Sequence, residues 1–238
     1  EMMKLFNMIL FCVGLVTAGL SAVAAESLGA DAKIEQVGPS LSHPWGISLT
    51  DDNTALITLR DGKLIRVELD SGEVTQISNV PAVFARRQGG LLDVVTHKDT
   101  SGLLSAYICY SKPVNGGAVT ALDRAELQKD RLINRQTLFQ ANDVSARAVH
   151  FGCRITIYNN HLFMSIGDRG QRDNAQALTS HAGAVVRLHL DGLIPENNPK
   201  FKNGAPGLFT KGHRNPQGMA IHPLTGAIWV NEHGPKGG

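Results

Sequence analysis

A glycine followed by a short apolar strand, a turn and a second apolar strand recurs four times along this chain. The glycines are Gly46, Gly90, Gly152 and Gly218, and the intervals between them range from 44 to 66 residues. Recurrence of one supersecondary unit at such intervals is typical of architectures that repeat a small sheet. The repeat therefore limits the chain to an all-β fold in which similar sheets follow one another.

Short runs of alternating apolar residues, separated by Gly, Asp and Asn, continue through most of the chain after residue 25. This alternation is typical of antiparallel strands, because successive side chains of a strand point to opposite faces of the sheet. Residues 55–59 and 63–69 flank Asp61-Gly62, which predicts a hairpin closed by a type I′ turn. Residues 118–127 fit a helix or a strand, and their setting favours a strand.

Each repeated unit is predicted to supply the innermost strands of one propeller blade. The glycine begins the strand nearest the central channel, where neighbouring backbones converge and a Cβ atom would clash. A β-sandwich with coincidental glycines is the alternative, because short and regularly spaced strands suit that fold too. Four units, of which the last reaches Gly238 without outer strands, indicate a truncated propeller with about four blades present.

The first residues differ in character from the rest of the chain. Lys4 precedes an uninterrupted apolar stretch from Met8 to Leu20, and Ala22-Val23-Ala24 has the small-x-small pattern of a cleavage site. Residues 1–24 are therefore predicted to be a secretory signal peptide, because their apolar stretch is short for a membrane span; an uncleaved anchor is the alternative. Residues 25–238 would then reach the periplasm or the exterior, with no stable membrane insertion. The formal net charge of +2 gives no electrostatic reason to expect nucleic-acid binding.

Two cysteines, Cys109 and Cys153, remain after the predicted signal peptide. Two cysteines do not make a disulfide framework, even in an oxidising compartment. Each lies in a predicted strand, which favours two small, buried apolar side chains. A single bridge between them is the alternative.

Polar residues recur at the starts of the predicted inner strands or in the loops beside them. They are Gln88, His150, Asp168-Arg169, His213-Arg214-Asn215 and His233-Gly234-Pro235. Equivalent ends of successive blades converge on one mouth of a propeller channel, where ligands bind. We therefore expect a single site at that mouth.

Chemistry can be assigned to four of these clusters. Asp168 follows the hairpin partner of the strand that His150 precedes, so a carboxylate–imidazole hydrogen bond would prepare His150 as a general base. A histidine satisfied by a loop carbonyl is the alternative. The Arg214 guanidinium can donate two hydrogen bonds to a carboxylate or to a quinone oxygen. Pairing of Arg214 with an acid of a neighbouring blade is the alternative. The carbonyls of Gly234 and Pro235 suit a hard cation such as Ca²⁺.

Six segments, in order from about residue 36 to the end, together resemble the soluble PQQ-dependent glucose and aldose sugar dehydrogenases. They are His43–Gly46, Arg87–Val94, His150–Arg154, Ile166–Gly170, Gly212–Gly218 and Glu232–Pro235. The resemblance implies a six-bladed β-propeller that binds pyrroloquinoline quinone (PQQ) and Ca²⁺ over the channel mouth. It also implies oxidation of an aldose at C1 to the lactone, by base-assisted hydride transfer to the quinone, with an electron acceptor that the sequence does not identify.

The resemblance also implies a role for each matched residue. His150 would take the proton of the anomeric hydroxyl group, Asp168 would orient it, and Arg214 would polarise the quinone carbonyl that receives the hydride. The remaining implied contacts are Gln88, Arg214 and Asn215 to PQQ, and the carbonyls of Gly234 and Pro235 to Ca²⁺. The sequence departs from the family at Ala148-Val149 and Cys153, where small residues are frequent.

Two other functions fit parts of this pattern. A non-catalytic propeller could bind a glycan or a protein, although a binder would not need His150, Asp168 and Arg214 together. A Ca²⁺-dependent hydrolase acting on lactones would need several acidic side chains around the channel, where this sequence offers mainly His, Arg and Asn.

Overall fold

The computed structural model describes residues 34–236. The chain divides into two units, residues 1–37 and 38–238, and the second contains the strands. The predicted signal peptide, residues 1–24, lies outside the described residues. Within residues 34–236, no helix has the length and apolar character required to cross a bilayer.

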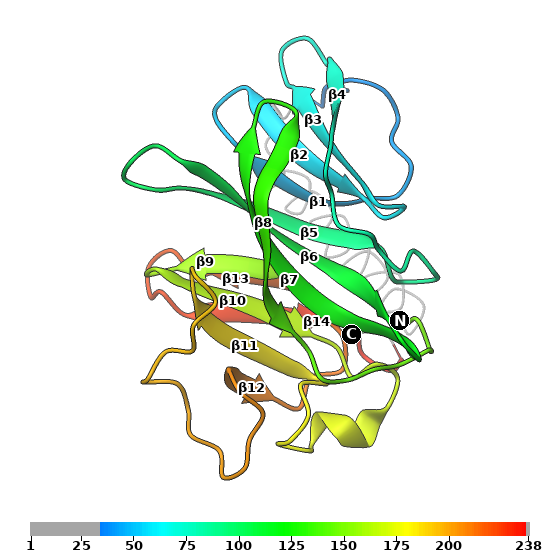
Figure 1. The fold of residues 1–238 in the computed structure, drawn as a ribbon, viewed down its shortest axis with the longest axis vertical. Coiled ribbons are helices and arrows are strands. Elements are labelled where there is room, and N and C mark those ends of the chain that lie inside the picture. Colours follow the sequence, from blue (N-terminus) through cyan, green and yellow to red (C-terminus); the bar gives the residue numbers. More distant parts are fainter. Residues whose placement is uncertain (1–33, 237–238) are drawn as a thin grey trace, which may run out of the picture. The chain divides into compact units, whose positions relative to one another are not determined.

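The second unit contains four antiparallel sheets, each a meander of consecutive strands (Figure 1). The first sheet is β1 (Pro44–Leu49), β2 (Thr54–Leu59), β3 (Lys63–Glu68) and β4 (Val74–Ile77). The second is β5 (Leu91–Lys98), β6 (Leu104–Val114), β7 (Gly117–Gln128) and β8 (Arg131–Gln140). The third is β9 (Ile155–Tyr158), β10 (His161–Ile166), β11 (Ala184–His189) and β12 (Leu208–Lys211), with the 3₁₀ helix η1 (Arg172–Ala175) before β11. The fourth is β13 (Pro216–Ile221) and β14 (Ile228–Glu232).

The four predicted strand–turn–strand units are the hairpins that begin these sheets, β1–β2, β5–β6, β9–β10 and β13–β14. The prediction of an all-β fold is confirmed, and so is the strand expected at residues 118–127, which belong to β7. The strands described form four separate sheets, which differs from the two facing sheets of a sandwich.

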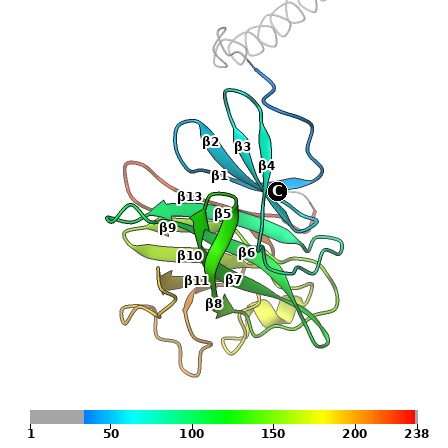
Figure 2. The same ribbon diagram turned by 45° about the horizontal axis from the view of Figure 1, so that its top comes forward.

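The first strands of successive sheets lie next to one another. β5 contacts β1 and β9, and β13 contacts β9; β13 is beside β9 in both Figure 1 and Figure 2. Close approach explains the glycine at the start of β1, because a Cβ atom on Gly46 would lie 2.6 Å from Oδ1 of Asp93 on β5. The predicted reason for this glycine, convergence of neighbouring backbones, is confirmed at this position.

The core occupies the spaces between neighbouring sheets. Leu56, Leu91 and Ile108 belong to a buried cluster shared by the first and second sheets. Leu92, which follows Leu91 in β5, belongs instead to a cluster shared with the third sheet, to which Met164 contributes. Alternation along β5 thus places side chains in the core on both faces of the second sheet, which explains why β5 and β6 have buried residues on both sides.

The turn predicted at Asp61-Gly62 is wrong in type. β2 and β3 pair from Leu59 to Lys63, so three residues connect them, and Gly62 has a φ of 108°. A three-residue loop ending in a left-handed glycine replaces the two-residue type I′ turn, in which both central residues have positive φ. Asn159-Asn160, which connects β9 and β10, does have two positive φ values, 48° and 58°.

The cysteine prediction is also wrong, and its alternative is correct. Cys109 on β6 and Cys153, just before β9, form a disulfide with an S–S distance of 1.99 Å and are completely buried. The bond joins the second sheet to the third. Two strands 44 residues apart in the chain come into contact only through packing of the sheets, so local sequence could not identify this pair.

Candidate active site

His150 and Asp168 lie at the same end of the β9–β10 hairpin and are hydrogen-bonded. The distance from Nδ1 of His150 to Oδ1 of Asp168 is 2.6 Å, and Asp168 also accepts the backbone N–H of Gly170 at 2.7 Å. The carboxylate is almost completely buried, whereas 15% of the His150 side chain is exposed. A carboxylate on Nδ1 fixes the tautomer and makes Nε2 the nitrogen available to a substrate.

The backbone around His150 has an unusual conformation. Ala148, His150, Gly152 and Cys153 have φ values of 55°, 51°, 62° and 75°. Side chains other than glycine rarely adopt this left-handed region, and such a conformation persists only where surrounding contacts hold it. We call residues 148–153 the His150 loop.

Gln88 and Asn215 supply two of those contacts. Oε1 of Gln88 accepts the N–H of His150 at 2.8 Å, and Oδ1 of Asn215 accepts the N–H of Gly152 at 3.2 Å. Because each amide oxygen is bonded within the protein, the amide N–H groups are what these side chains can offer to a ligand. Both residues thus have a structural role that the sequence did not predict.

A cavity of about 370 Å³ opens beside the His150 loop. Its lining residues are Trp45, Arg60, Gln88, His150, Arg214, Asn215, Gln217, His233 and Gly234. Five of the seven predicted site residues are among them. Of the residues described, those that line this cavity include two arginines and no carboxylate, so it favours a ligand with negative charge or carbonyl oxygens.

The other two predicted residues, Asp168 and Pro235, line a neighbouring cavity of about 640 Å³. His150 and Arg214 line both spaces and therefore stand between them. Arg172 of η1 also lines the larger cavity. A reacting group at the His150 ring can thus be approached from two sides.

Arg214 is oriented by the end of β14 and the residues that follow that strand. Glu232, at the end of β14, accepts the backbone N–H groups of Arg214 and Asn215. The Arg214 guanidinium donates to the carbonyls of His233 and Gly234 at 2.8 and 3.2 Å, and it forms no ion pair with the acids of residues 34–236. The sheet ending in β14 therefore directs a positive charge to the cavity.

One of these carbonyls, that of Gly234, belongs to the Ca²⁺ site predicted at Gly234 and Pro235. Backbone carbonyl oxygens are ligands that Ca²⁺ accepts, and here they converge on a cationic group. A Ca²⁺ ion at the Gly234 carbonyl would compete with Arg214 for that oxygen. Residues 34–236 contain no group of three His, Cys, Asp or Glu side chains that could hold a metal ion, so carbonyls are the donors to consider.

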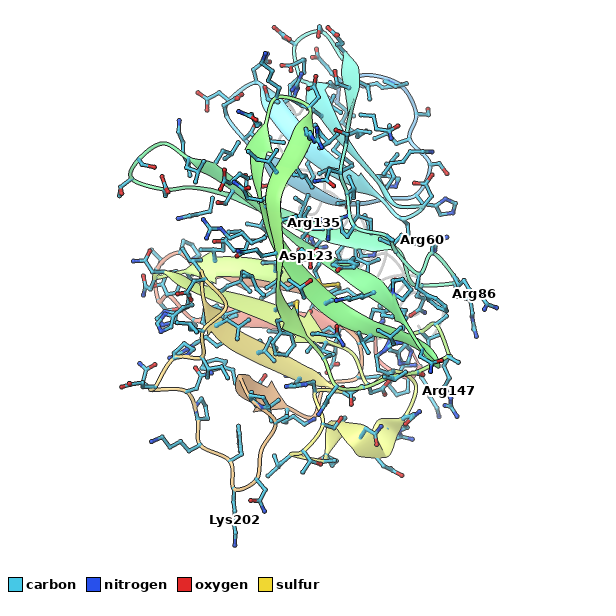
Figure 3. All side chains as sticks on the ribbon, in the orientation of Figure 1. Arg60, Arg86, Asp123, Arg135, Arg147 and Lys202 are labelled. Carbon is cyan, nitrogen blue, oxygen red and sulfur yellow. A yellow bond between two sulfur atoms is a disulfide. The ribbon has the colours of Figure 1, made fainter. Side chains whose placement is uncertain are left out.

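Arg60 is the main lining residue that sequence reasoning missed. It follows β2, directly before Asp61-Gly62, and no motif of the sequence singled it out. Asp168 follows β10 and His233 follows β14, so Arg60 occupies the equivalent position in the first unit, and comparison of the units could have found it. Figure 3 shows Arg60 on the same side of the view as Arg147, which lies just before the His150 loop.

Comparison with known proteins gives the family. A family model described as "Glucose / Sorbosone dehydrogenase" matches residues 41–238. The chain belongs to this family. The resemblance seen in the six motifs is thereby confirmed.

Relatives and solved structures of the family share most of this chain. It is 38% identical to aldose sugar dehydrogenase YliI of Escherichia coli (strain K12) over 216 residues, which are 88% of this chain and 58% of that protein. It is 29% identical to quinoprotein glucose dehydrogenase B of Acinetobacter calcoaceticus over 231 residues, 83% of this chain and 47% of that protein. The crystal structure of the soluble aldose sugar dehydrogenase from Escherichia coli in the apo-form superposes with a TM-score of 0.81 at 36% identity, covering 87% of this chain and 61% of that one. The chain thus spans about half the length of these curated relatives.

Proposed function

We propose that this chain forms part of a PQQ-dependent dehydrogenase that oxidises an aldose at C1 to the lactone. The observation that carries the proposal is the His150–Asp168 pair, held at 2.6 Å beside a cavity lined by cationic and N–H donor groups. An aldose substrate is supported by the names of the two relatives, one an aldose sugar dehydrogenase and the other a glucose dehydrogenase. The quinone is supported by the second relative, which is named a quinoprotein.

The residues present suit PQQ, a flat quinone with three carboxylates. Arg60 and Arg214 offer positive charge, and Gln88 and Asn215 offer N–H groups because their oxygens are bonded elsewhere. We propose that Gln88, Arg214 and Asn215 hold the cofactor, and that the carbonyls of Gly234 and Pro235 hold Ca²⁺ beside it. When bound, PQQ would supply the acceptor for the hydride from C1.

The side chains of the chain would contribute proton transfer and charge. Nε2 of His150 takes the proton of the C1 hydroxyl group, while Asp168 holds Nδ1–H and stabilises the imidazolium that forms. Removal of that proton strengthens C1 as a hydride donor. Arg214 would stabilise negative charge at the hydride acceptor, and its guanidinium would have to give up the Gly234 carbonyl for that oxygen to bind Ca²⁺.

The wider architecture and location are part of the same proposal. Meander sheets whose first strands adjoin in chain order support a six-bladed propeller, to which these residues contribute about four blades. The buried disulfide supports an oxidising compartment, and thus a periplasmic or secreted protein.

Reconstitution tests the function. The full protein, supplied with PQQ and Ca²⁺, is expected to reduce an artificial dye with aldoses. His150→Ala should lower turnover by about 10²–10⁴-fold and retain PQQ binding, because a general base contributes about that factor. His161→Ala, in β10, is the control, since its ring stacks on His189 outside the two cavities described above.

Other results would favour the other functions. Failure to oxidise any sugar of a broad panel would favour a binding protein, and lactone hydrolysis without PQQ would favour a hydrolase. Near wild-type turnover of His150→Ala would show that His150 is not the base.

A further inference from the structure

Arg169 is a fully buried charged side chain beside the proposed base. It is 1% exposed and is the largest of the fully buried side chains in residues 34–236. Burial of a guanidinium is unfavourable unless its surroundings compensate for the lost water. Neither cavity at His150 is lined by Arg169, so contact with a ligand does not explain its burial.

The contacts of Arg169 lie on both sides of His150. Nη1 donates to the carbonyl of Val149 at 3.2 Å, and the guanidinium carbon lies 3.6 Å from the centre of the Phe151 ring. Nη2 donates to the carbonyl of Ala118 on β7 at 3.4 Å. One planar group thus binds both neighbours of His150 and links them to the second sheet.

The positive charge of Arg169 is balanced by two carboxylates to which it is not hydrogen-bonded. Burial lowers the pKa of Arg169 to about 10, while the carboxylates of Asp143 and Asp168 act in the opposite direction. The group therefore stays protonated at neutral pH. Within residues 34–236 its hydrogen bonds go to carbonyls and not to a carboxylate.

The His150 loop needs support because of its left-handed backbone. Gln88 and Asn215 bond the N–H groups of His150 and Gly152 from the cavity side. Arg169 contacts Val149 and Phe151 from the protein interior. The two sets of contacts together hold the chain on both sides of His150.

We propose that Arg169 is a positioning residue that fixes the orientation of the His150 ring through Val149 and Phe151. It acts on the base through the backbone and an aromatic ring, and it does not touch substrate or cofactor. The kinetic part of this inference rests on the proposed function, whereas the part about loop order does not.

The test uses Arg169→Met in the full protein without cofactor. Methionine keeps much of the apolar contact with Phe151 but removes the N–H donors and the charge. Arg187→Met is the matched control, because Arg187 lies 5.4 Å from the Phe209 ring centre and, like Arg169, has a buried Nε with no partner among the described residues. Hydrogen exchange of the amides of residues 149–153 is measured, with those of β2 and β3 as reference.

Exchange in the His150 loop should rise at least about tenfold in Arg169→Met, because two charge-assisted hydrogen bonds are lost, and should stay unchanged in Arg187→Met. Arg169→Lys, which keeps the charge, should give an intermediate rise and provides the test if the methionine variant fails to fold. Unchanged exchange in the loop, or an equal rise in β2 and β3, would overturn the proposal, since the second result indicates a general structural role.

Kinetics of the protein loaded with PQQ and Ca²⁺ give a second readout. Turnover should fall about tenfold or more with the KM for the sugar within about twofold, because a displaced base impairs reaction more than binding. Equal loss in Arg187→Met would overturn the positioning role. The wild type could oxidise no sugar while exchange in the His150 loop is still faster in Arg169→Met than in the wild type. That result would contradict the proposed function and leave the positioning of His150 supported.

Discussion

His150 and His181 differ in the hydrogen-bond partners of their two ring nitrogens. His150 has a carboxylate on Nδ1, and its Nε2 has no hydrogen-bond partner among the described residues. His181 is buried, with Nδ1 accepting the N–H of Asn142 at 3.2 Å and Nε2 donating to the Pro206 carbonyl at 2.9 Å. These two hydrogen bonds fit the neutral ring, which has one acceptor and one donor nitrogen. Burial lowers the pKa of His181 below the usual 6.5.

This difference predicts acid sensitivity at His181. Because its pKa is lower in the folded than in the unfolded state, unfolded chains take up the proton first as the pH falls below 6.5, and stability decreases by up to about 1.4 kcal/mol per pH unit until the folded pKa is reached. The free energy of unfolding of His181→Gln should depend less on pH in this range. Urea unfolding between pH 7.5 and 5 measures this, and equal slopes for the two proteins would contradict it.

At the scale of the element, the His150 loop connects a buried bridge with a reactive side chain. Cys153 ends the loop and is bonded to Cys109 on β6, while Thr120 on β7 donates to the Phe151 carbonyl at 2.9 Å. The loop is thus attached to the second sheet, although it leads into the third. The orientation of His150 depends on the contact between these two sheets.

Removing this bridge should destabilise the protein. A double variant, Cys109→Ala with Cys153→Ala, is expected to lose about 2–4 kcal/mol of unfolding free energy, because an unfolded chain without the bridge gains conformational freedom over a 44-residue separation. Guanidinium unfolding with and without reductant measures the loss. Reductant should lower the midpoint of the wild type and leave that of the variant unchanged; a wild type insensitive to full reduction would argue against the role of the bridge.

At the scale of the whole unit, Arg154 links the first strands of all four sheets. It precedes β9, pairs with Asp93 of β5 at 2.9 Å, donates to the Gln217 carbonyl of β13 at 2.9 Å, and lies 4.6 Å from the ring centre of Trp45 on β1. Burial raises the pKa of Asp93 to about 6, although Arg154 and two backbone N–H groups act in the opposite direction. The contact between the first strands of the sheets therefore includes the buried Asp93 carboxylate, whose charged form is stabilised by Arg154.

Arg154→Met should therefore destabilise the protein in a pH-dependent way. The loss is expected to be roughly 2–4 kcal/mol at pH 8, where Asp93 would be a buried charge without its cation. It should be smaller at pH 5, because an acid whose folded pKa is raised loses stability as the pH rises from its unfolded value of 3.8 through the folded value. Adding Asp93→Asn should recover part of the loss at pH 8. Unfolding at both pH values decides, and a loss independent of pH would contradict this account.

Strand pattern, hairpin order and residue types of the site follow from the sequence alone. Alternation of side chains and the conformation of turns depend on neighbours in the chain, so residues 118–127 were identified correctly as a strand. Where a turn depends on pairing register, as at Asp61-Gly62, local reasoning gave the wrong type. The motifs also gave His150, Asp168 and Arg214 their candidate roles.

Only the tertiary structure decided how these parts meet. It joined Cys109 to Cys153, brought Arg60 to the cavity and turned the oxygens of Gln88 and Asn215 toward the His150 loop. The disulfide and the bonds of Gln88 and Asn215 join different sheets or their loops across 44 or more residues of chain. They depend on how whole sheets pack, which no local pattern of residues specifies.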